Sequence, residues 1–285
     1  MLDWQGDATV LARRKHGETA VILTVFARDA GVINGVVPGG AGARRGPMLQ
    51  PGNRLSLRWR ARLADQLGTF TAEPLASRAG LMDDPATLAG LNAVTALLAY
   101  ALPERDPHPH LWDRTEDLLN AMQAGGDWAG RYLRWELTLL DELGFGLVLD
   151  RCAVTGATEG LAYVSPRTGH AVSAAGAGEW APRLLPLPAL LGGPDSSAGS
   201  GSVHGSGGGS GGGIAQALAV TGHFLNANLA EAQIGRPLPA ARDRLVRRLS
   251  RAAVGGGTTQ DRVDRKSGSA GMPRPSVLSR MPSSA

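Results

Sequence analysis

One segment near the N-terminus alternates apolar and polar side chains, and this pattern restricts the fold more than any other. The run NRLSLRWRARLA occupies residues 53–64 and follows a turn signal, QPGN. Its alternate positions are apolar (Leu55, Leu57, Trp59, Ala61 and Leu63), and all but one of the positions between them are arginine (Arg54, Arg58, Arg60 and Arg62). A period of two predicts a half-buried β-strand with an arginine-rich outer face.

Further strands are expected on both sides of this segment. A first strand ends near residues 13–15, TAVILTVFA and GVINGVV predict strands at 19–27 and 31–37, and TFTAEPL predicts a last one at 69–75. Five short strands in fewer than eighty residues favour a small closed barrel of the OB type, because closure removes the sheet edges. We therefore expect an α+β protein whose residues 1–78 form a five-stranded OB-fold barrel.

The middle of the chain predicts helices. Asp84 and Pro85 are typical of a helix start and open a helix up to Pro103, and a second helix is expected over 111–124. A third is expected from the cap residue Asp127 to Gly144, with apolar residues at three- and four-residue spacing. Successive helices with short loops indicate a helical domain, which we place at residues 79–191.

The rest of the chain differs in composition. Residues 192–213 are rich in Gly and Ser and predict a flexible linker. Helices are expected again at 214–226 and 239–253, so residues 214–254 would complete the helical domain. Residues 255–285 lack a core-forming pattern and predict a disordered tail.

Composition excludes several classes of protein. No stretch of about 18 or more apolar residues occurs, and the opening MLDWQGD lacks the basic and apolar regions of a secretory signal. The single cysteine, Cys152, cannot form an internal disulfide or a cysteine-rich zinc site. We therefore expect a soluble, cytoplasmic protein without a membrane partner.

The formal net charge of +4 is unevenly distributed. Residues 1–80 carry 11 basic and 6 acidic side chains, residues 81–200 carry 7 and 15, and residues 201–285 carry 11 and 4. Basic ends around an acidic middle favour a polyanionic partner. A GC-rich genome that uses arginine for ordinary surface charge would give the same counts, so the counts alone leave both explanations open.

Basic residues of the barrel are the candidates for nucleic-acid binding, because OB folds follow single strands with basic grooves. They lie at the end of the first strand, in a glycine-rich loop and on the alternating strand: Arg13, Arg14, Lys15, Arg44, Arg45, Arg54, Arg58, Arg60 and Arg62. An arginine face without acids would repel itself unless a polyanion covers it; the alternative is a solvated strand face. Trp59 should point inward, so we expect contacts to the phosphate backbone without sequence readout.

An arginine cluster on the predicted helix 239–253 is a second candidate site. Arg242, Arg244 and Arg248 could pair with a carboxylate-rich peptide while Leu245 and Leu249 face the core. The alternative is a surface helix on which arginine only supplies solvating charge.

Catalytic and metal sites have little support in the sequence. His108 and His110 supply two ligands of the three or four that zinc needs, and a proline-broken loop favours a solvated position for both. Cys152 has no companion ligand and is expected to behave as a small buried apolar residue. We predict no catalytic residue, no metal site and no cofactor.

Two long stretches carry a family resemblance. The opening LDWQGDATVLARRKHGETAVILTVFARDAGVINGVVPGG and the later YLRWELTLLDELGFGLVLDRCAVTG, LAYVSPRTGHAVS and RLLPLPALL resemble the RecO family of bacterial DNA repair proteins. The resemblance covers residues 1–191 and 214–251. It implies a non-enzymatic mediator of the RecF recombination pathway, active at the nucleoid. Such a protein binds single- and double-stranded DNA, anneals complementary strands and helps RecR load RecA onto DNA coated by SSB.

Expected partners follow from the same resemblance: DNA, RecR, the acidic C-terminal tail of SSB at Arg242, Arg244 and Arg248, and RecF. Many relatives carry four zinc-binding cysteines after the segment that ends in Cys152, but Thr155 stands where the second would be. We therefore expect a small subdomain near residues 150–180 that holds together without zinc. The alternative function is a protein-interaction adaptor whose OB fold touches DNA only incidentally.

Overall fold

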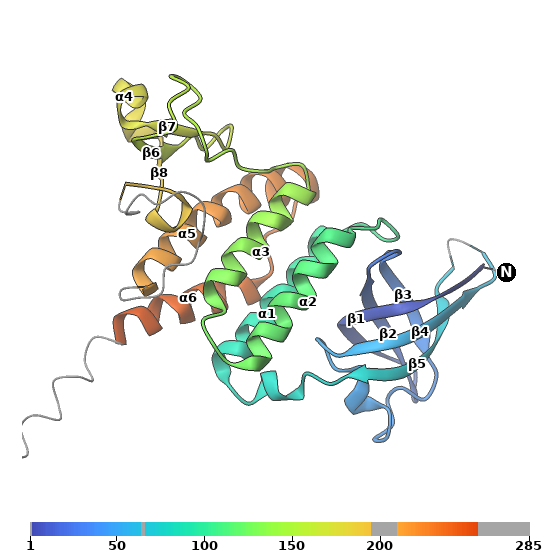
Figure 1. The fold of residues 1–285 in the computed structure, drawn as a ribbon. Helices are drawn as coiled ribbons and strands as arrows, with labels where there is room; N and C mark the ends of the chain where they lie inside the picture. Colours follow the sequence, from blue (N-terminus) through green and yellow to red (C-terminus); the bar gives the residue numbers. More distant parts are fainter. Residues whose placement is uncertain (1, 64–65, 195–209, 256–285) are drawn as a thin grey trace, which may run out of the picture.

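The computed structural model describes residues 2–63, 66–194 and 210–255. Most of the predicted linker (195–209) and nearly all of the predicted tail (256–285) lie outside the described residues. The described chain forms a barrel, a helical domain beside it and a small sheet at the far end of the helices (Figure 1).

Five strands form the predicted N-terminal barrel, in the spatial order β1-β2-β3-β5-β4. They are β1 (Leu2–His16), β2 (Ala20–Ala27), β3 (Gly31–Val37), β4 (Arg54–Ala61) and β5 (Gly68–Ala76). Neighbouring strands are antiparallel except at the closing seam, where β3 and β5 run parallel over only two residue pairs. The expected OB-type barrel is confirmed.

Buried and exposed side chains alternate along β4 as predicted, up to Ala61. Leu55, Leu57 and Trp59 are buried in the barrel core, and Arg58 and Arg60 between them are exposed. The strand ends at Ala61, so Leu63 lies in the following loop and is 59% exposed, contrary to its expected inward position.

Glycine makes the seam possible. A Cβ on Gly68 would lie 2.3 Å from the Trp59 ring, and a Cβ on Gly35 would lie 2.6 Å from the Phe70 ring. Both rings are buried, and any larger residue at the seam would displace them. The two glycines therefore let the bulky aromatic core reach the closing strands.

The helical domain confirms the predicted helices with small shifts at their ends. Its helices are α1 (Pro85–Ala101), α2 (Pro109–Ala124), α3 (Ala129–Glu142), α5 (Ser210–Phe224) and α6 (Ala240–Gly255), with a π-helix (Leu225–Ile234) between the last two. The carboxylate of Asp84 accepts hydrogen bonds from the Ala86 and Thr87 amides, as an N-cap does. Among the described residues, no helix is long and apolar enough to cross a membrane.

Three local predictions are wrong. Trp128, and not Asp127, is the N-cap of α3, and its buried ring packs into the core. The fifth helix begins at Ser210, inside the segment predicted as linker. His108 is not solvated: it is 9% exposed, and its Nδ1 lies 2.9 Å from Glu142 Oε2 because α3 ends beside the start of α2.

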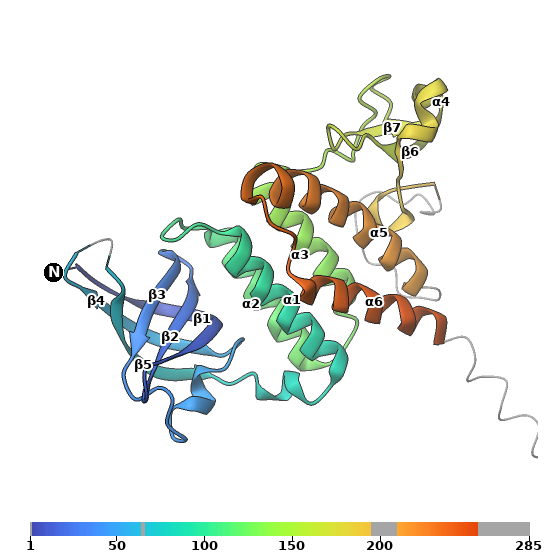
Figure 2. The same cartoon turned by 180° about the vertical axis from the view of Figure 1, so that it is seen from behind.

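A small sheet within residues 144–194 was not predicted as such. It has the order β7-β6-β8, with β6 (Leu161–Val164), β7 (Ala171–Ser173) and β8 (Leu185–Pro186), and a one-turn helix α4 (Ala174–Ala177) follows β7. The sheet lies at the end of the helical domain away from the barrel (Figure 2). It occupies the place of the expected small subdomain.

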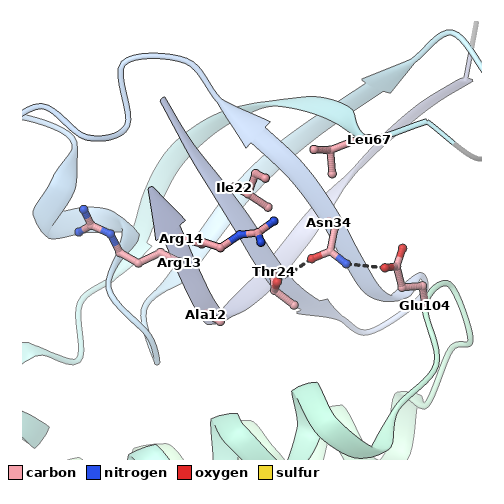
Figure 3. Close-up of a pocket in the computed structure, with 8 residues that line it drawn as sticks. All are labelled: Ala12, Arg13, Arg14, Ile22, Thr24, Asn34, Leu67 and Glu104. Atoms are coloured by element: carbon pink, nitrogen blue, oxygen red, sulfur yellow. Dashed lines mark hydrogen bonds between the residues drawn. The ribbon is translucent and has the colours of Figure 1, made fainter. Parts of the chain in front are cut away.

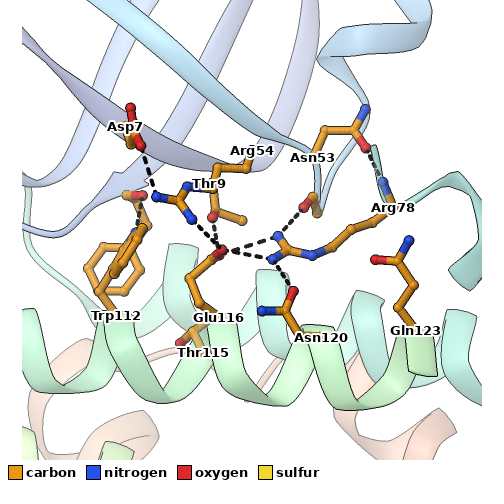
Figure 4. A network of polar contacts seen from close by, with 12 residues as sticks. Asp7, Thr9, Asn53, Arg54, Arg78, Trp112, Thr115, Glu116, Asn120 and Gln123 are labelled. Carbon is orange, nitrogen blue, oxygen red and sulfur yellow. Dashed lines mark hydrogen bonds and ion pairs between the residues drawn. The ribbon is translucent and has the colours of Figure 1, made fainter. Parts of the chain in front are cut away.

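A buried polar network joins the barrel to α2 (Figure 4). Glu116 on α2 accepts hydrogen bonds from Thr9 of β1 at 2.5 Å and from Arg78 at 2.7 Å. Arg78 is 2% exposed and also donates to the Gly52 carbonyl and to Asn120. One carboxylate therefore holds the first strand, the interdomain connection and the second helix together.

Candidate nucleic-acid interface

A hollow of about 420 Å³ opens on the outer face of β1, β2 and β3 (Figure 3). It is lined by Ala12, Arg13, Arg14, Ile22, Thr24, Asn34, Leu67 and Glu104. The first residues come from the three strands, Leu67 from the loop between β4 and β5, and Glu104 from the loop between α1 and α2. OB folds bind oligonucleotides on the face of their second and third strands, beside this same β4–β5 loop.

Arg14 reaches into the hollow because of the β1 register. It pairs with Ile22 of β2, and its side chain extends over the strands toward Thr24 and Asn34 (Figure 3). Lys15, the next residue, is exposed. Neither side chain has a carboxylate partner among the residues that the structure describes, so both charges face solvent uncompensated.

Arg13 has a different role from its neighbour. Although Arg13 also lines the hollow, its guanidinium group points away from that of Arg14 (Figure 3) and donates to the Gly46 carbonyl at 2.9 Å, which holds the glycine-rich loop against β1. In that loop Arg45 donates to the Pro38 carbonyl at 2.8 Å, and Arg44 is exposed. The predicted candidates of the first strand and the loop are thus brought together at one end of the barrel.

The floor of the hollow is a fixed chain of hydrogen bonds. Thr24 Oγ1 donates to Asn34 Oδ1 at 2.6 Å, and Asn34 Nδ2 donates to Glu104 Oε1 at 2.6 Å. The sequence did not predict these two hydrogen bonds. A polar Asn34 inside the apolar strand GVINGVV was the one available signal, but nothing near it in the sequence points to Glu104, seventy residues further on.

The arginine row on β4 is not free of acids, and the argument that it would repel itself is wrong. Antiparallel pairing with β1 places Asp3 beside Arg58 and Arg60, at 2.6 and 3.6 Å, and hydrogen bonding from Arg58 lowers the pKa of the Asp3 carboxyl. Arg54 pairs with Asp7 at 2.8 Å and lies over the Trp112 ring. The acids come from another strand, so the alternation on β4 alone could not reveal them.

Arg62 differs from the rest of the row. It follows the last residue of β4, is exposed and has no carboxylate partner among the described residues. It also begins the loop that contributes Leu67 to the hollow. Of the predicted row, Arg62 is therefore the residue without an ion pair in the described part of the chain.

Arg242 cannot dock a peptide, which corrects that part of the prediction. Its side chain is 6% exposed, and it donates to both carboxylate oxygens of Glu136 on α3 at 2.8 Å. Burial lowers the pKa of Arg242, but Glu136 more than offsets this and raises it. Arg244 and Arg248 are exposed on the same helix, while Leu245 is buried and Leu249 packs against the core as predicted.

The surroundings of Cys152 are polar although the residue is buried. Its sulfur accepts hydrogen bonds from the Ser173 amide at 3.2 Å, the Ser173 hydroxyl at 3.3 Å and the Thr155 amide at 3.4 Å. Burial raises the pKa of the thiol, but these hydrogen bonds outweigh it and lower the pKa to about 6. Within the described ranges, no group of three or more His, Cys, Asp or Glu residues could hold a metal ion.

The closed five-stranded barrel, the hollow on its second and third strands and the attached helices define an OB-fold protein with an appended helical domain. Two family models match the chain: "Recombination protein O N terminal" over residues 1–78 and "Recombination protein O C terminal" over residues 82–235. The chain belongs to the recombination protein O (RecO) family of DNA repair proteins.

Curated relatives agree over most of the chain. The DNA repair protein RecO of Paracoccus denitrificans is 62% identical over 249 residues, which is 87% of this chain and 97% of the relative. The RecO of Cereibacter sphaeroides strain ATCC 17025 is 52% identical over 251 residues, and that of a Ruegeria species is 48% identical over 251 residues. These matches cover 88% of this chain and 100% and 99% of the two relatives. The similarity supports a role in DNA repair.

Proposed function

We propose that the chain is a DNA-binding mediator of the RecF recombination pathway, which binds single- and double-stranded DNA and anneals complementary strands. The observation that carries the proposal is a set of exposed cations that have no carboxylate partner among the described residues: Arg14, which lines the hollow, Lys15, which follows it in β1, and Arg62, at the start of the loop that contributes Leu67. They lie next to the face on which OB folds bind oligonucleotides. No catalytic step is needed for this activity.

The mechanism is electrostatic. Two complementary strands repel each other through their phosphates, and cations that neutralise phosphates on both strands lower that repulsion. In the proposed complex one strand follows β1 from the glycine-rich loop to the loop after β4, so that Arg44, Lys15, Arg14 and Arg62 contact its phosphates in turn. Arg54, Arg58 and Arg60 contribute less, because Asp7 pairs with Arg54 and Asp3 is shared by Arg58 and Arg60, which leaves one of the three charges uncompensated by these two carboxylates.

The salt dependence of binding tests this arrangement. Replacing Arg14 and Lys15 with Ala should reduce the slope of log K against log salt by about 1.4 for a single strand, since each phosphate contact contributes about 0.7. The control is Arg131→Ala with Arg167→Ala, two exposed arginines of the helical domain, and it should leave the slope unchanged. An unchanged slope in the first variant would place the DNA elsewhere on the chain.

The partners belong to the same proposal. We expect RecR, RecA and RecF as partners in recombination at the nucleoid, and docking of the acidic SSB tail on the exposed side of α6. There Arg244 and Arg248 are exposed, and the charge of Arg248 also helps to lower the pKa of Asp84, whereas Arg242 is buried. Arg244→Glu with Arg248→Glu should abolish binding of an acidic tail peptide and leave binding of bare DNA largely intact.

A protein-interaction adaptor is the second candidate. Leu2, Leu63 and Leu67 are 44%, 59% and 46% exposed, and Leu2 pairs with Ala61 at the end of β4 where the loop with the other two begins. Exposed apolar side chains at one end of a barrel are typical of a protein contact. Tight binding of a protein partner, together with weak DNA binding that salt abolishes, would favour this candidate.

A further inference from the structure

The hollow on the barrel carries opposite charges on its two sides. Arg14, which has no ion-pair partner in the described part of the chain, supplies a positive charge at one side, and Glu104 supplies a carboxylate at the other (Figure 3). A phosphate is attracted to the first side and repelled from the second. A ligand that fits both sides must carry an anionic group and, a short distance from it, a group that donates hydrogen bonds.

We propose that the hollow is a base-reading pocket that takes one nucleotide whose base bears an exocyclic amino group, in preference to one with a carbonyl at that position. The inference rests on the proposed function, because it needs a nucleic acid on this face of the barrel. In this arrangement Arg14 binds the phosphate, and the base lies over Asn34 with its amino group toward Glu104.

The donors and acceptors of Asn34 and Glu104 that face the hollow determine which base binds. Asn34 uses one Nδ2 hydrogen for Glu104 and one Oδ1 lone pair for Thr24. Among the described residues, its second hydrogen and second lone pair have no partner, and neither has Oε2 of Glu104. The floor therefore offers two acceptors and one donor, and cytosine and adenine present the complement, an amino group next to a ring nitrogen that accepts.

A carbonyl in place of the amino group reverses the interaction. Uracil and thymine would direct an oxygen at the Glu104 carboxylate, which is repulsive and leaves an acceptor without a donor. The orientation of the Asn34 amide is fixed from both ends, so the amide cannot turn over to accommodate such a base. The walls of the hollow do not discriminate, because Ile22 and Leu67 offer only apolar contact to either ring.

The charge of the hollow also argues against an acidic peptide, the other class of ligand that Arg14 could bind, and the volume suits a nucleotide. An acidic peptide would bring a second carboxylate toward Glu104, where repulsion opposes binding. About 420 Å³ is ample for a single base with part of its sugar. A nucleotide satisfies both charged sides at once.

The test uses the full chain and two matched oligonucleotides, oligo(dC) and oligo(dU), of equal length at one fixed salt concentration. Cytosine and uracil differ only in the amino or carbonyl group and in the proton on the neighbouring nitrogen. Fluorescence anisotropy should show oligo(dC) binding roughly tenfold more tightly than oligo(dU), the size of discrimination expected from one well-paired base.

Two variants test separately the carboxylate side and the arginine side of the pocket. Glu104→Gln removes the charge and adds a donor, so the preference for oligo(dC) should fall to about one, mainly because oligo(dU) binds more tightly. Arg14→Ala should weaken both oligonucleotides to the same extent and leave the preference intact. Thermal unfolding of each variant checks that the fold is retained.

The outcomes distinguish the two proposals. If the chain binds both oligonucleotides equally, or if Glu104→Gln leaves the preference unchanged, the base-reading pocket is overturned while the proposed DNA-binding function stands. If neither oligonucleotide binds, the proposed function fails and the inference with it. A preference that Glu104→Gln abolishes supports both.

Discussion

Replacing Arg242 with Met should destabilise the helical domain severely. Arg242 on α6 makes two hydrogen bonds of 2.8 Å to Glu136 and one of 2.7 Å to the Leu218 carbonyl, so it joins α6 to α3 and α5. Methionine fills much of the same space but leaves the Glu136 carboxylate, which is 0% exposed, without its countercharge. The loss of one partner of a buried ion pair costs about 3–5 kcal/mol.

We expect the lower end of that range. Tyr132 and Thr221 each donate a hydrogen bond of 2.6 Å to Glu136, and both remain in the variant. A loss of about 3 kcal/mol is still a large part of the roughly 5–15 kcal/mol that stabilises a typical domain. The free energy of unfolding from urea denaturation, followed by circular dichroism, measures it.

The matched control is Arg244→Met on the same helix. Arg244 is exposed, so its replacement should change the free energy of unfolding by less than about 0.5 kcal/mol. Glu136→Gln combined with Arg242→Met should recover part of the loss, because no uncompensated charge remains while Tyr132 keeps an acceptor. A loss below about 1 kcal/mol in Arg242→Met would refute the structural role and reopen the docking role of this arginine.

Three further predictions concern other parts of the chain. Glu116→Ala should destabilise the junction between barrel and helices by about 3 kcal/mol, because Arg78 would be left buried without its countercharge; unfolding of an Asp117→Ala control, exposed on the same helix, should be unchanged. The pKa of the Cys152 thiol, about 6 when folded against an ordinary value of 9.0, means that this group's contribution to stability is present above pH 9 and is lost as the pH falls through 6. Cys152→Ser should therefore flatten the pH dependence of unfolding in that range, and an unchanged dependence would contradict the low pKa. Arg58→Ala should weaken DNA binding less than Arg14→Ala in the same anisotropy titration, since Asp3 already compensates Arg58; equal losses would argue against the distinction.

Local patterns predicted the elements of this fold well. The alternation of residues 53–61 reflects burial on one face of β4, and the spacing of Leu91 and Leu98 reflects burial on one face of α1. Such patterns depend only on residues close together in the sequence, so the residues of one segment are enough to predict its strand or helix. The small sheet of β6, β7 and β8 escaped prediction because its strands are two to four residues long, too short for a period to show.

The site was harder to predict because it depends on contacts between distant segments. Asp3 on β1 pairs with Arg58 on β4. Glu136 pairs with the buried Arg242, which lies more than a hundred residues later in the sequence. Glu104, in the loop between α1 and α2, accepts a hydrogen bond from Asn34. A sequence pattern shows that an arginine lies on a strand or helix, but not which carboxylate lies opposite. Of the predicted cations, those left without an ion pair or hydrogen bond among the described residues are Arg14, Lys15, Arg44, Arg62, Arg244 and Arg248, since Arg13 and Arg45 bond backbone carbonyls and the others pair with carboxylates.

We propose that Arg14, Lys15 and Arg62, which lack a carboxylate partner within the described ranges, carry the activity on DNA, rather than the paired arginines Arg54, Arg58 and Arg60 of β4. The most direct measurement is the annealing rate of complementary oligonucleotides coated with the cognate SSB, compared between three forms of the full chain. These are the unchanged protein, Arg14→Ala with Lys15→Ala and Arg62→Ala, and Arg54→Ala with Arg58→Ala and Arg60→Ala. We predict that the unchanged protein accelerates annealing, that the first variant loses the acceleration and that the second keeps most of it. Loss in the second variant with full activity in the first would contradict the claim.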